Sequence, residues 1–149
     1  MLTLSIKEPN VKNFMKILFY DDAFDIFEVR GVSVTHFVKF DVDGALAGGE
    51  DKSHASWAEL KNYIAHFIKG KTKPKHIKII FSLPRESLDN VAQNIAAAFL
   101  NMEYKDDEIR FLTATSQKEF SLNKEHDVKW DEYAVNFLKR NKVVFTVES

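Results

Sequence analysis

The chain has 149 residues, of which 45% are hydrophobic and 29% are charged, a composition typical of a soluble globular protein with one core of ordinary size. Its net charge of −1 provides no general attraction to nucleic acid or to an anionic membrane, so any such binding must be local. Because there is no cysteine, disulfides, thiolate zinc sites and cysteine nucleophiles are excluded. No stretch resembles a signal peptide or a membrane-spanning run of about 18 apolar residues, so we expect one cytoplasmic domain over residues 1–149 and no membrane partner.

The first two predicted elements are a strand and a short helix. Residues 2–7 alternate apolar and polar side chains, which predicts a strand with one buried face that ends before Pro9. Asn10 is a suitable N-cap residue, and apolar side chains then recur with helical spacing from Val11 to about Phe19. We therefore expect a helix directly after the first strand.

The next region is rich in residues that favour strands. Residues 24–29 and 32–42 contain many β-branched and aromatic side chains, and Gly31 between them is a turn residue. This pattern predicts an antiparallel pair of strands that is connected at Gly31. Residues 44–54 follow as the longest irregular segment.

The central helix has the clearest signals in the sequence. Ser56 and Glu59 have the spacing of a capping box, and Gly70 supplies a left-handed residue that would stop the helix. Its apolar stripe consists of Trp57, Leu60, Ile64, Phe67 and Ile68. A lysine-rich connection over 71–76 then leads into 77–81, the most apolar predicted strand.

A third helix and a hairpin are predicted after this strand. Residues 84–97 show an amphipathic pattern that begins with proline, and Glu86 lies near the positive end of the helix dipole. Residues 99–104 and 109–115 have strand composition and flank an acidic turn over 105–108. We therefore expect these two strands to form a hairpin.

The last part of the chain is predicted to hold a short strand, a helix and a final strand. Residues 120–122 would extend the hairpin into a meander. Asp127 is placed to cap a helix whose apolar stripe runs from Trp130 to Leu138. Residues 143–147 have the composition of a closing strand.

Both halves of the chain thus show the order strand, helix, two or three strands, then a helix led by tryptophan. The motif Trp-Ala-Glu at 57–59 corresponds to Trp-Asp-Glu at 130–132. We predict an α+β fold with a mostly antiparallel sheet, about four amphipathic helices, and an internal duplication of residues 2–69 and 77–140. Each half alone is small for a stable core, so pairing the halves would complete it.

The duplicated order is similar to that of DNA sliding-clamp domains, which contain two such units with their helices facing the DNA. This similarity implies a clamp-like arrangement, at the level of element order alone. The helices led by tryptophan are additional to that pattern. The predicted helix over 84–97 also carries Glu86 and Asp89 where a clamp would have lysines.

Several short runs carry a second resemblance that spans most of the chain. They are Phe67–Lys71, Ile77–Leu83, Phe99-Leu100, Tyr104, Thr113–Ser116, Lys118, Phe120, Leu122, Trp130–Glu132 and Phe137–Lys139. Together they resemble an uncharacterised family of Firmicutes proteins of similar length, which implies a bacterial origin. That family has no assigned function, so the resemblance implies no catalytic or ligand-binding residue.

Five lysines form the candidate phosphate or nucleic-acid site: Lys69, Lys71, Lys73, Lys75 and Lys78. They lie within ten residues that contain no acidic side chain, a density that can hold phosphate groups by counterion release. The alternative is a solvated connection, because lysine-rich loops are common and the whole chain is not basic. Gly70-Lys71-Thr72 is not a Walker loop, since it follows a helix and lacks the upstream glycine.

Asp41 and Asp43 are the candidate metal ligands, because alternate residues of a strand point the same way. Further hard ligands follow closely in the sequence at Glu50, Asp51 and His54. Against a metal site, aspartate followed by glycine at 43–44 is ordinary turn chemistry, and the spacing fits no calcium loop. The five histidines do not show the paired spacing of a zinc site. We therefore predict no metal and no cofactor.

The sequence contains no catalytic constellation. Thr115 and Ser116 lack the glycine-flanked elbow of a hydrolase nucleophile, and Thr113 alternates with Thr115 as residues on one strand face do. We therefore expect a non-enzymatic binding or interaction module, for which a protein is one candidate partner. Two alternatives stay open: a small enzyme whose site assembles only in the fold, and weak nucleic-acid or phosphate binding through residues 69–78.

Overall fold

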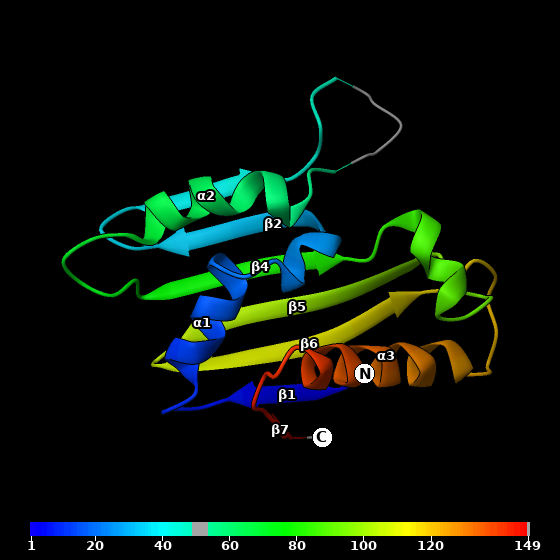
Figure 1. Cartoon of the computed structure of the whole chain (residues 1–149). Coiled ribbons are helices and arrows are strands. Elements are labelled where there is room, and N and C mark those ends of the chain that lie inside the picture. Colours follow the sequence, from blue (N-terminus) through cyan, green and yellow to red (C-terminus); the bar gives the residue numbers. More distant parts are fainter. Residues whose placement is uncertain (49–53, 149) are drawn as a thin grey trace.

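The computed structural model describes residues 1–48 and 54–148, and a single seven-stranded sheet forms its centre (Figure 1). The strands follow the order β3-β2-β4-β5-β6-β1-β7, and every neighbouring pair is antiparallel. Their bounds are β1 (Thr3–Ile6), β2 (Glu28–Thr35), β3 (Lys39–Asp43), β4 (His76–Ser82), β5 (Ala97–Lys105), β6 (Glu108–Ser116) and β7 (Thr146–Val147). The predicted α+β class with an antiparallel sheet is confirmed.

Helices cover one face of this sheet. Figure 1 shows α1, α2 and α3 on the same side of the strands. The helices are α1 (Val11–Phe19), the 3-10 helix η1 (Ala23–Ile26), α2 (Trp57–Ile68), the 3-10 helix η2 (Arg85–Asn90) and α3 (Glu125–Arg140). The opposite face therefore has no helical layer within the described part of the chain.

The central helix begins as the sequence predicts but ends differently. The backbone amide of Glu59 donates to Ser56 Oγ, and the amide of Ser56 donates to Glu59 Oε1 (3.0 Å), which completes the capping box. Gly70 does not adopt the predicted left-handed conformation. It instead packs so closely on His36 that an added Cβ would lie 2.5 Å from the imidazole Cε1. Any larger residue at this position would therefore require the His36 ring to shift.

The predicted turn at Gly31 is wrong. Gly31 lies inside β2, at a register shift against β4 between Val29 and Gly31. Glycine is common at such bulges, because it lacks a Cβ that would conflict with the irregular backbone. The chain instead reverses at 36–38, where β2 passes into β3. Residues 24–26 belong to η1 and not to a strand, with the ring of Phe24 fully buried.

The predicted helix over 84–97 is also wrong. Only residues 85–90 are helical, as η2, and β5 begins at Ala97. Asn94 holds the intervening segment as a loop, since its side chain exchanges two hydrogen bonds with the backbone of Glu119 (2.9 and 3.0 Å). Side-chain bonds of this kind compete with helical backbone bonds. The helix prediction relied on the spacing of apolar residues such as Leu88 and Ile95. Both side chains are buried, but no continuous helix connects them.

Three boundaries near the end of the chain differ from prediction. Residues 120–122 form no strand, and Gln117 closes this segment into a loop through two hydrogen bonds of 3.0 Å to the backbone of Ser121. Asp127 lies inside α3, which begins at Glu125. The predicted strand over 143–147 is reduced to the two residues of β7.

The internal duplication is not confirmed, because the two halves have different strand orders. In the second half, β4, β5 and β6 are direct neighbours. In the first half, β1 is separated from β2 by those same three strands. Trp57 and Trp130 are both buried, but Trp57 Nε1 donates to Leu18 O on α1 whereas Trp130 Nε1 donates to Phe99 O on β5. The structure likewise gives no support for a clamp-like arrangement.

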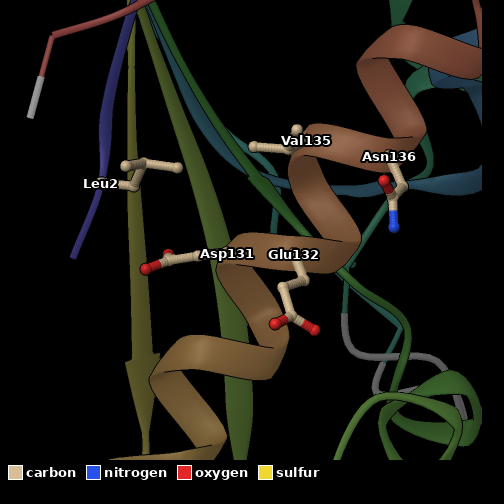
Figure 2. A pocket seen from close by; sticks show the side chains of 5 residues that line it. All are labelled: Leu2, Asp131, Glu132, Val135 and Asn136. Carbon is tan, nitrogen blue, oxygen red and sulfur yellow. The ribbon is translucent and has the colours of Figure 1, made fainter.

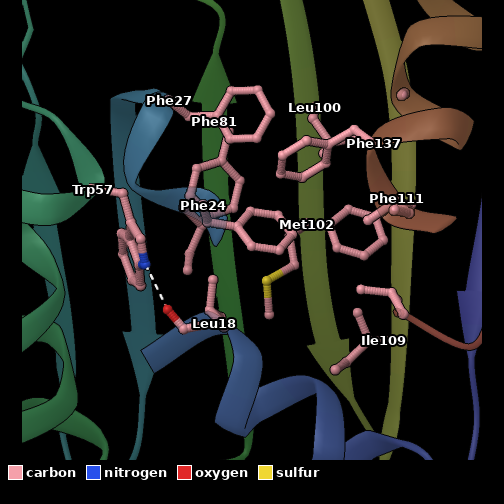
Figure 3. Packing of buried hydrophobic residues seen from close by; sticks show 14 of the residues in the cluster. Leu18, Phe24, Phe27, Trp57, Phe81, Leu100, Met102, Ile109, Phe111 and Phe137 are labelled. Atoms are coloured by element: carbon pink, nitrogen blue, oxygen red, sulfur yellow. Dashed lines mark hydrogen bonds between the residues drawn. The ribbon is translucent and has the colours of Figure 1, made fainter. Parts of the chain in front are cut away.

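Aromatic rings fill the core between the sheet and the helices (Figure 3). Phe24 lies at the centre of this cluster, with ring centroids 5.6 Å from Phe14, 5.3 Å from Phe81 and 5.2 Å from Phe137. Most of these pairs meet edge to face or tilted, the arrangements that aromatic rings prefer. The core thus joins α1, η1, β4 and α3 into one body.

Candidate functional site

The face of the sheet opposite the helices is the largest surface that the fold leaves without a helical cover. We call it the open face. Its side chains alternate along each strand with the buried ones. Its central residues are Arg30, Gly31 and Ser33 on β2; Lys78, Ile80 and Ser82 on β4; Phe99, Asn101 and Glu103 on β5; and Arg110, Leu112 and Ala114 on β6.

One row of the open face consists of polar and charged residues, and its charged side chains alternate in sign from one strand to the next. The strand register places Lys78 beside Glu103, and Glu103 beside Arg110. On the other side of Lys78 lies Ser33, whose hydroxyl donates to Asp41 Oδ1 (2.8 Å). Opposite charges on neighbouring strands stabilise a sheet modestly. The row is therefore electrically balanced within one chain.

On one side of this charged row, the next two rows carry almost no charge. Ile80, Asn101 and Leu112 follow one another across three strands, and Leu112 is 36% exposed. The following row contains Phe99 and Ala114 as a cross-strand pair. No layer of residues 1–48 and 54–148 covers this neutral band, so it presents partly exposed apolar surface to solvent.

Arg30 borders the neutral band. Its guanidinium carbon lies 5.4 Å from the ring centroid of Phe99, and its Nε donates to the hydroxyl of Ser82 (3.1 Å). A guanidinium over an aromatic face is attracted by the ring quadrupole. Arg30 is therefore held flat against the sheet instead of extending into solvent.

His76, the first residue of β4, forms a hydrogen bond with Glu103 of the charged row. Its Nε2 lies 2.8 Å from Glu103 Oε2, and this hydrogen bond is the main reason that the pKa of Glu103 lies below its ordinary value. The nearby ammonium groups of Lys78 and Lys105 lower the pKa further, while partial burial opposes the shift. Glu103 is therefore held in its ionised form.

The structure places all five predicted phosphate-binding lysines at the surface: Lys69, Lys71, Lys73, Lys75 and Lys78. It also brings acids to them that the local sequence does not contain. Lys73 Nζ lies 3.0 Å from Asp107 Oδ1, and Lys78 lies beside Glu103. The bond from Lys73 is the main cause of a lowered pKa at Asp107. Two of the five positive charges are thus offset by acids.

The lysine segment is attached to the β2–β3 turn. His36 Nε2 lies 2.8 Å from the backbone carbonyl oxygen of Thr72, and the ring of His36 packs against Gly70. The next residue in that turn, Phe37, is 81% exposed. An exposed aromatic residue therefore directly follows the histidine that contacts the lysine segment. Sequence reasoning missed this because 37 and 69–75 are distant in the chain.

Asp41 and Asp43 do not meet as a pair of free carboxylates. Asp41 accepts the bond from Ser33 and lies 3.8 Å from Lys39 Nζ, while Asp43 Oδ1 accepts the backbone amide of Ala45 (2.9 Å). Within residues 1–48 and 54–148, no three histidine or acidic side chains gather as a metal site would require. The other sequence candidates, Glu50 and Asp51, lie outside the described residues.

Thr113 and Thr115 connect β6 to α3. Thr113 Oγ1 donates to Asp131 Oδ1 (2.5 Å), and Thr115 Oγ1 donates to Asp127 Oδ1. Two residues of a strand advance about 6.8 Å, and four residues of a helix advance about 6 Å, so the two pairs have matching spacing. The hydroxyl of Thr115 is thereby engaged in a structural bond, as the sequence reading of these threonines expects.

Two pockets flank α3. The smaller, about 270 Å³, is lined by Leu2, Asp131, Glu132, Val135 and Asn136. Figure 2 shows Asp131 and Val135 of the helix extending toward Leu2, while Glu132 and Asn136 point away from it. Its carboxylate at Asp131 is already bonded to Thr113. The larger, about 540 Å³, lies at the start of α3 near η2, where buried His126 has Nε2 3.7 Å from Asp127 Oδ1.

Comparison with known proteins identifies the family of the chain. The sequence pattern of DUF5721, a family of unknown function, matches residues 17–146. No curated protein and no solved structure matches the chain. Among the described residues, no helix has both the length and the apolar character needed to cross a membrane. Because the match covers most of the sequence and includes both the open face and the lysine segment, the chain belongs to this family of unknown function.

Proposed function

We propose that the protein is a cytoplasmic, non-enzymatic binding module that docks through the open face of its sheet. One observation carries the proposal: all three α-helices lie on one side, while the other side presents a neutral band with Leu112, Phe99 and Ile80. Apolar surface that is rimmed by charge is characteristic of protein interaction sites. Arg30 adds a residue type that is enriched at such interfaces.

The open face also suits docking because it is rigid. Its residues lie on four central strands that are hydrogen-bonded on both sides. A preorganised surface loses little conformational entropy on binding, so more of its contact energy becomes affinity. The charged row beside the neutral band would then set the orientation of the partner more than the strength of binding.

A substitution in the neutral band tests the proposal. Leu112→Asp places a charge in the band, and Val128→Asp is the matched control because Val128 is exposed at 53% on α3. Both purified variants should show native circular dichroism. In capture experiments from cell extract, partners bound by the wild type and the control should be lost by Leu112→Asp. Identical partner sets for all three proteins would refute docking through the open face.

A second candidate function is supported by Phe37. Its exposed side chain follows His36, which contacts Gly70 and Thr72 of the lysine segment. Lys69 and Lys71 in that segment form no ion pair with an acid in the described part of the chain. Aromatic rings next to lysines bind single-stranded nucleic acid, because the ring stacks on a base while the ammonium groups hold phosphates. The phosphate-binding role of residues 69–78 stays a prediction.

Fluorescence anisotropy with labelled single-stranded oligonucleotides at low salt tests this second function. Phe37→Ala and the pair Lys69→Glu with Lys71→Glu should each weaken binding, and only the lysine variant should reduce its salt dependence. Lys139→Glu on α3 serves as a control, because it places a charge reversal of the same kind at a distant site. Absence of binding by the wild-type protein would eliminate the candidate.

A further inference from the structure

We propose that the open face of the β5–β6 hairpin docks on the same face of a second copy of this chain. The two copies would be related by a two-fold axis that runs along the strands, between β5 and β6. This proposal rests on the proposed function, since it specifies the occupant of the open face. Three features of the hairpin carry it: its charges, its side-chain sizes and its area.

The charges on the two strands of the hairpin are opposite at each charged row. Lys105 on β5 faces Glu108 on β6, and Glu103 on β5 faces Arg110 on β6. A two-fold rotation about an axis between the strands keeps each row in place and exchanges the two strands. It therefore sets Glu103 of one copy over Arg110 of the other, and Lys105 over Glu108. The surface is electrostatically complementary to itself, as an isologous contact requires.

The neutral rows are complementary in size. Phe99 and Ala114 form a cross-strand pair, so the same rotation sets the large ring of one copy over the small side chain of the other. Asn101 would meet Leu112, and its amide already donates to the carbonyl of Leu112 within its own chain (3.2 Å). Covering Asn101 thus leaves that donor satisfied. Alternating large and small side chains let two sheets interdigitate at a separation of about 10 Å.

The available area fits a reversible dimer. Strands lie about 4.8 Å apart and advance about 3.4 Å per residue. The nine-residue strands β5 and β6, with the seven residues of β4 and the four of β1, therefore present roughly 470 Å² in projection. Stable interfaces bury about 800 Å² per partner, and weaker ones bury less. We therefore expect a concentration-dependent dimer that weakens at high salt, because charged rows form part of the contact.

Charge reversal at one row tests the arrangement. Glu103→Lys sets two positive charges against each other in a homodimer, and Arg110→Glu sets two negative charges against each other. Each variant alone should dissociate about tenfold or more readily than the wild type. An equimolar mixture should form a heterodimer, since the introduced lysine of one copy would face the introduced glutamate of the other, and the native Arg110 would face the native Glu103. The double variant should dimerise with itself, and Lys139→Glu on α3 should behave as wild type.

Sedimentation velocity and native mass spectrometry of the purified full chain, up to roughly 100 μM, provide the measurement. A wild-type dimer, monomeric single variants and a mixed heterodimer support the proposal. A monomeric wild type, or a dimer that neither single reversal weakens, would overturn it. If the wild type is monomeric but Leu112→Asp still loses a different captured protein, the second copy is refuted as the occupant while docking through the open face is retained.

Discussion

Replacing Trp57 tests how the central helix contributes to the core. The side chain is 0% exposed, and its ring centroid lies 5.5 Å from the rings of both Phe19 and Phe81. Its Nε1 donates to the carbonyl oxygen of Leu18 (2.8 Å), as Figure 3 shows. Leu18 lies in the last turn of α1, where carbonyl groups have no partner within the helix. Trp57 therefore fills the core and also satisfies the end of α1.

These two roles give the expected magnitude. Truncating a buried tryptophan to alanine costs about 3–5 kcal/mol through lost contacts and the remaining cavity. Leaving the buried carbonyl of Leu18 without a donor adds about 1–3 kcal/mol. We expect Trp57→Ala to lower the free energy of unfolding by about 5 kcal/mol, which approaches the whole stability of many small domains. Trp57→Phe keeps an aromatic ring but removes the donor, so we expect about 2–3 kcal/mol.

Urea unfolding at 25 °C, followed by far-ultraviolet circular dichroism, measures both values. Tyr63→Ala is the control, because Tyr63 lies on the same helix with 66% exposure and should change stability by less than about 0.5 kcal/mol. If Trp57→Ala proves too unstable to fold, Trp57→Phe still gives a measurable transition. A Trp57→Phe protein as stable as the wild type would refute the reasoning, since neither the larger indole ring nor its hydrogen bond would then contribute.

Three further predictions follow from single contacts. Gly44→Ala should destabilise the fold strongly in urea unfolding, because the new Cβ would lie 1.7 Å from the carbonyl oxygen of Val29. Thr113→Val should lower the unfolding free energy by about 1–3 kcal/mol, since it leaves the carboxylate on α3 without its donor. His76→Gln should raise the pKa of Glu103 toward its ordinary value near 4.5, measured by NMR titration. Because the folded pKa is lowered, the stabilisation from Glu103 is complete above the unfolded pKa and disappears as pH falls through the folded one.

Local signals in the sequence predicted the elements that local physics determines. The capping box at Ser56, the helix over 11–19 and the hairpin around 105–108 all form where their residues indicate. Each depends on hydrogen bonds or periodicity within a few residues of the chain. Such signals do not require knowledge of the tertiary fold.

The wrong predictions arose where distant contacts override local preference. The spacing of Leu88 and Ile95 suits a helix, but the bond between Asn94 and the backbone near residue 119 holds that segment as a loop. The supposed turn at Gly31 became a bulge because β2 pairs with β4, a strand more than forty residues later. No pattern within either segment could reveal those partners.

The candidate site was only partly predictable for the same reason. The five lysines are visible in the sequence, but the acids that offset Lys73 and Lys78 come from β5 and the turn after it. The open face could not be recognised, because alternation identifies two faces of a strand without showing which one helices will cover. Only the strand order brings Glu103 and Arg110 into the rows on which the dimer proposal depends.

The position of β1 has a consequence for the order of events during synthesis. Thr3 pairs with Leu112, so β1 must wait for a partner that is made more than a hundred residues later. At about 5–20 residues per second, this wait lasts roughly 5–20 s. Meanwhile β3 and then β4 can pair with the two sides of β2, and β5 and β6 can add beyond β4 in chain order.

During that interval the apolar side chains of Leu4 and Ile6 have no partner strand, and the growing sheet ends at the open edge of β5 until β6 is made. An unpaired apolar strand and an open edge are the two features that promote misassembly between nascent chains. The nascent protein is therefore most exposed to aggregation just before β1 inserts. Shielding the apolar side chains of β1 through this period would therefore reduce aggregation.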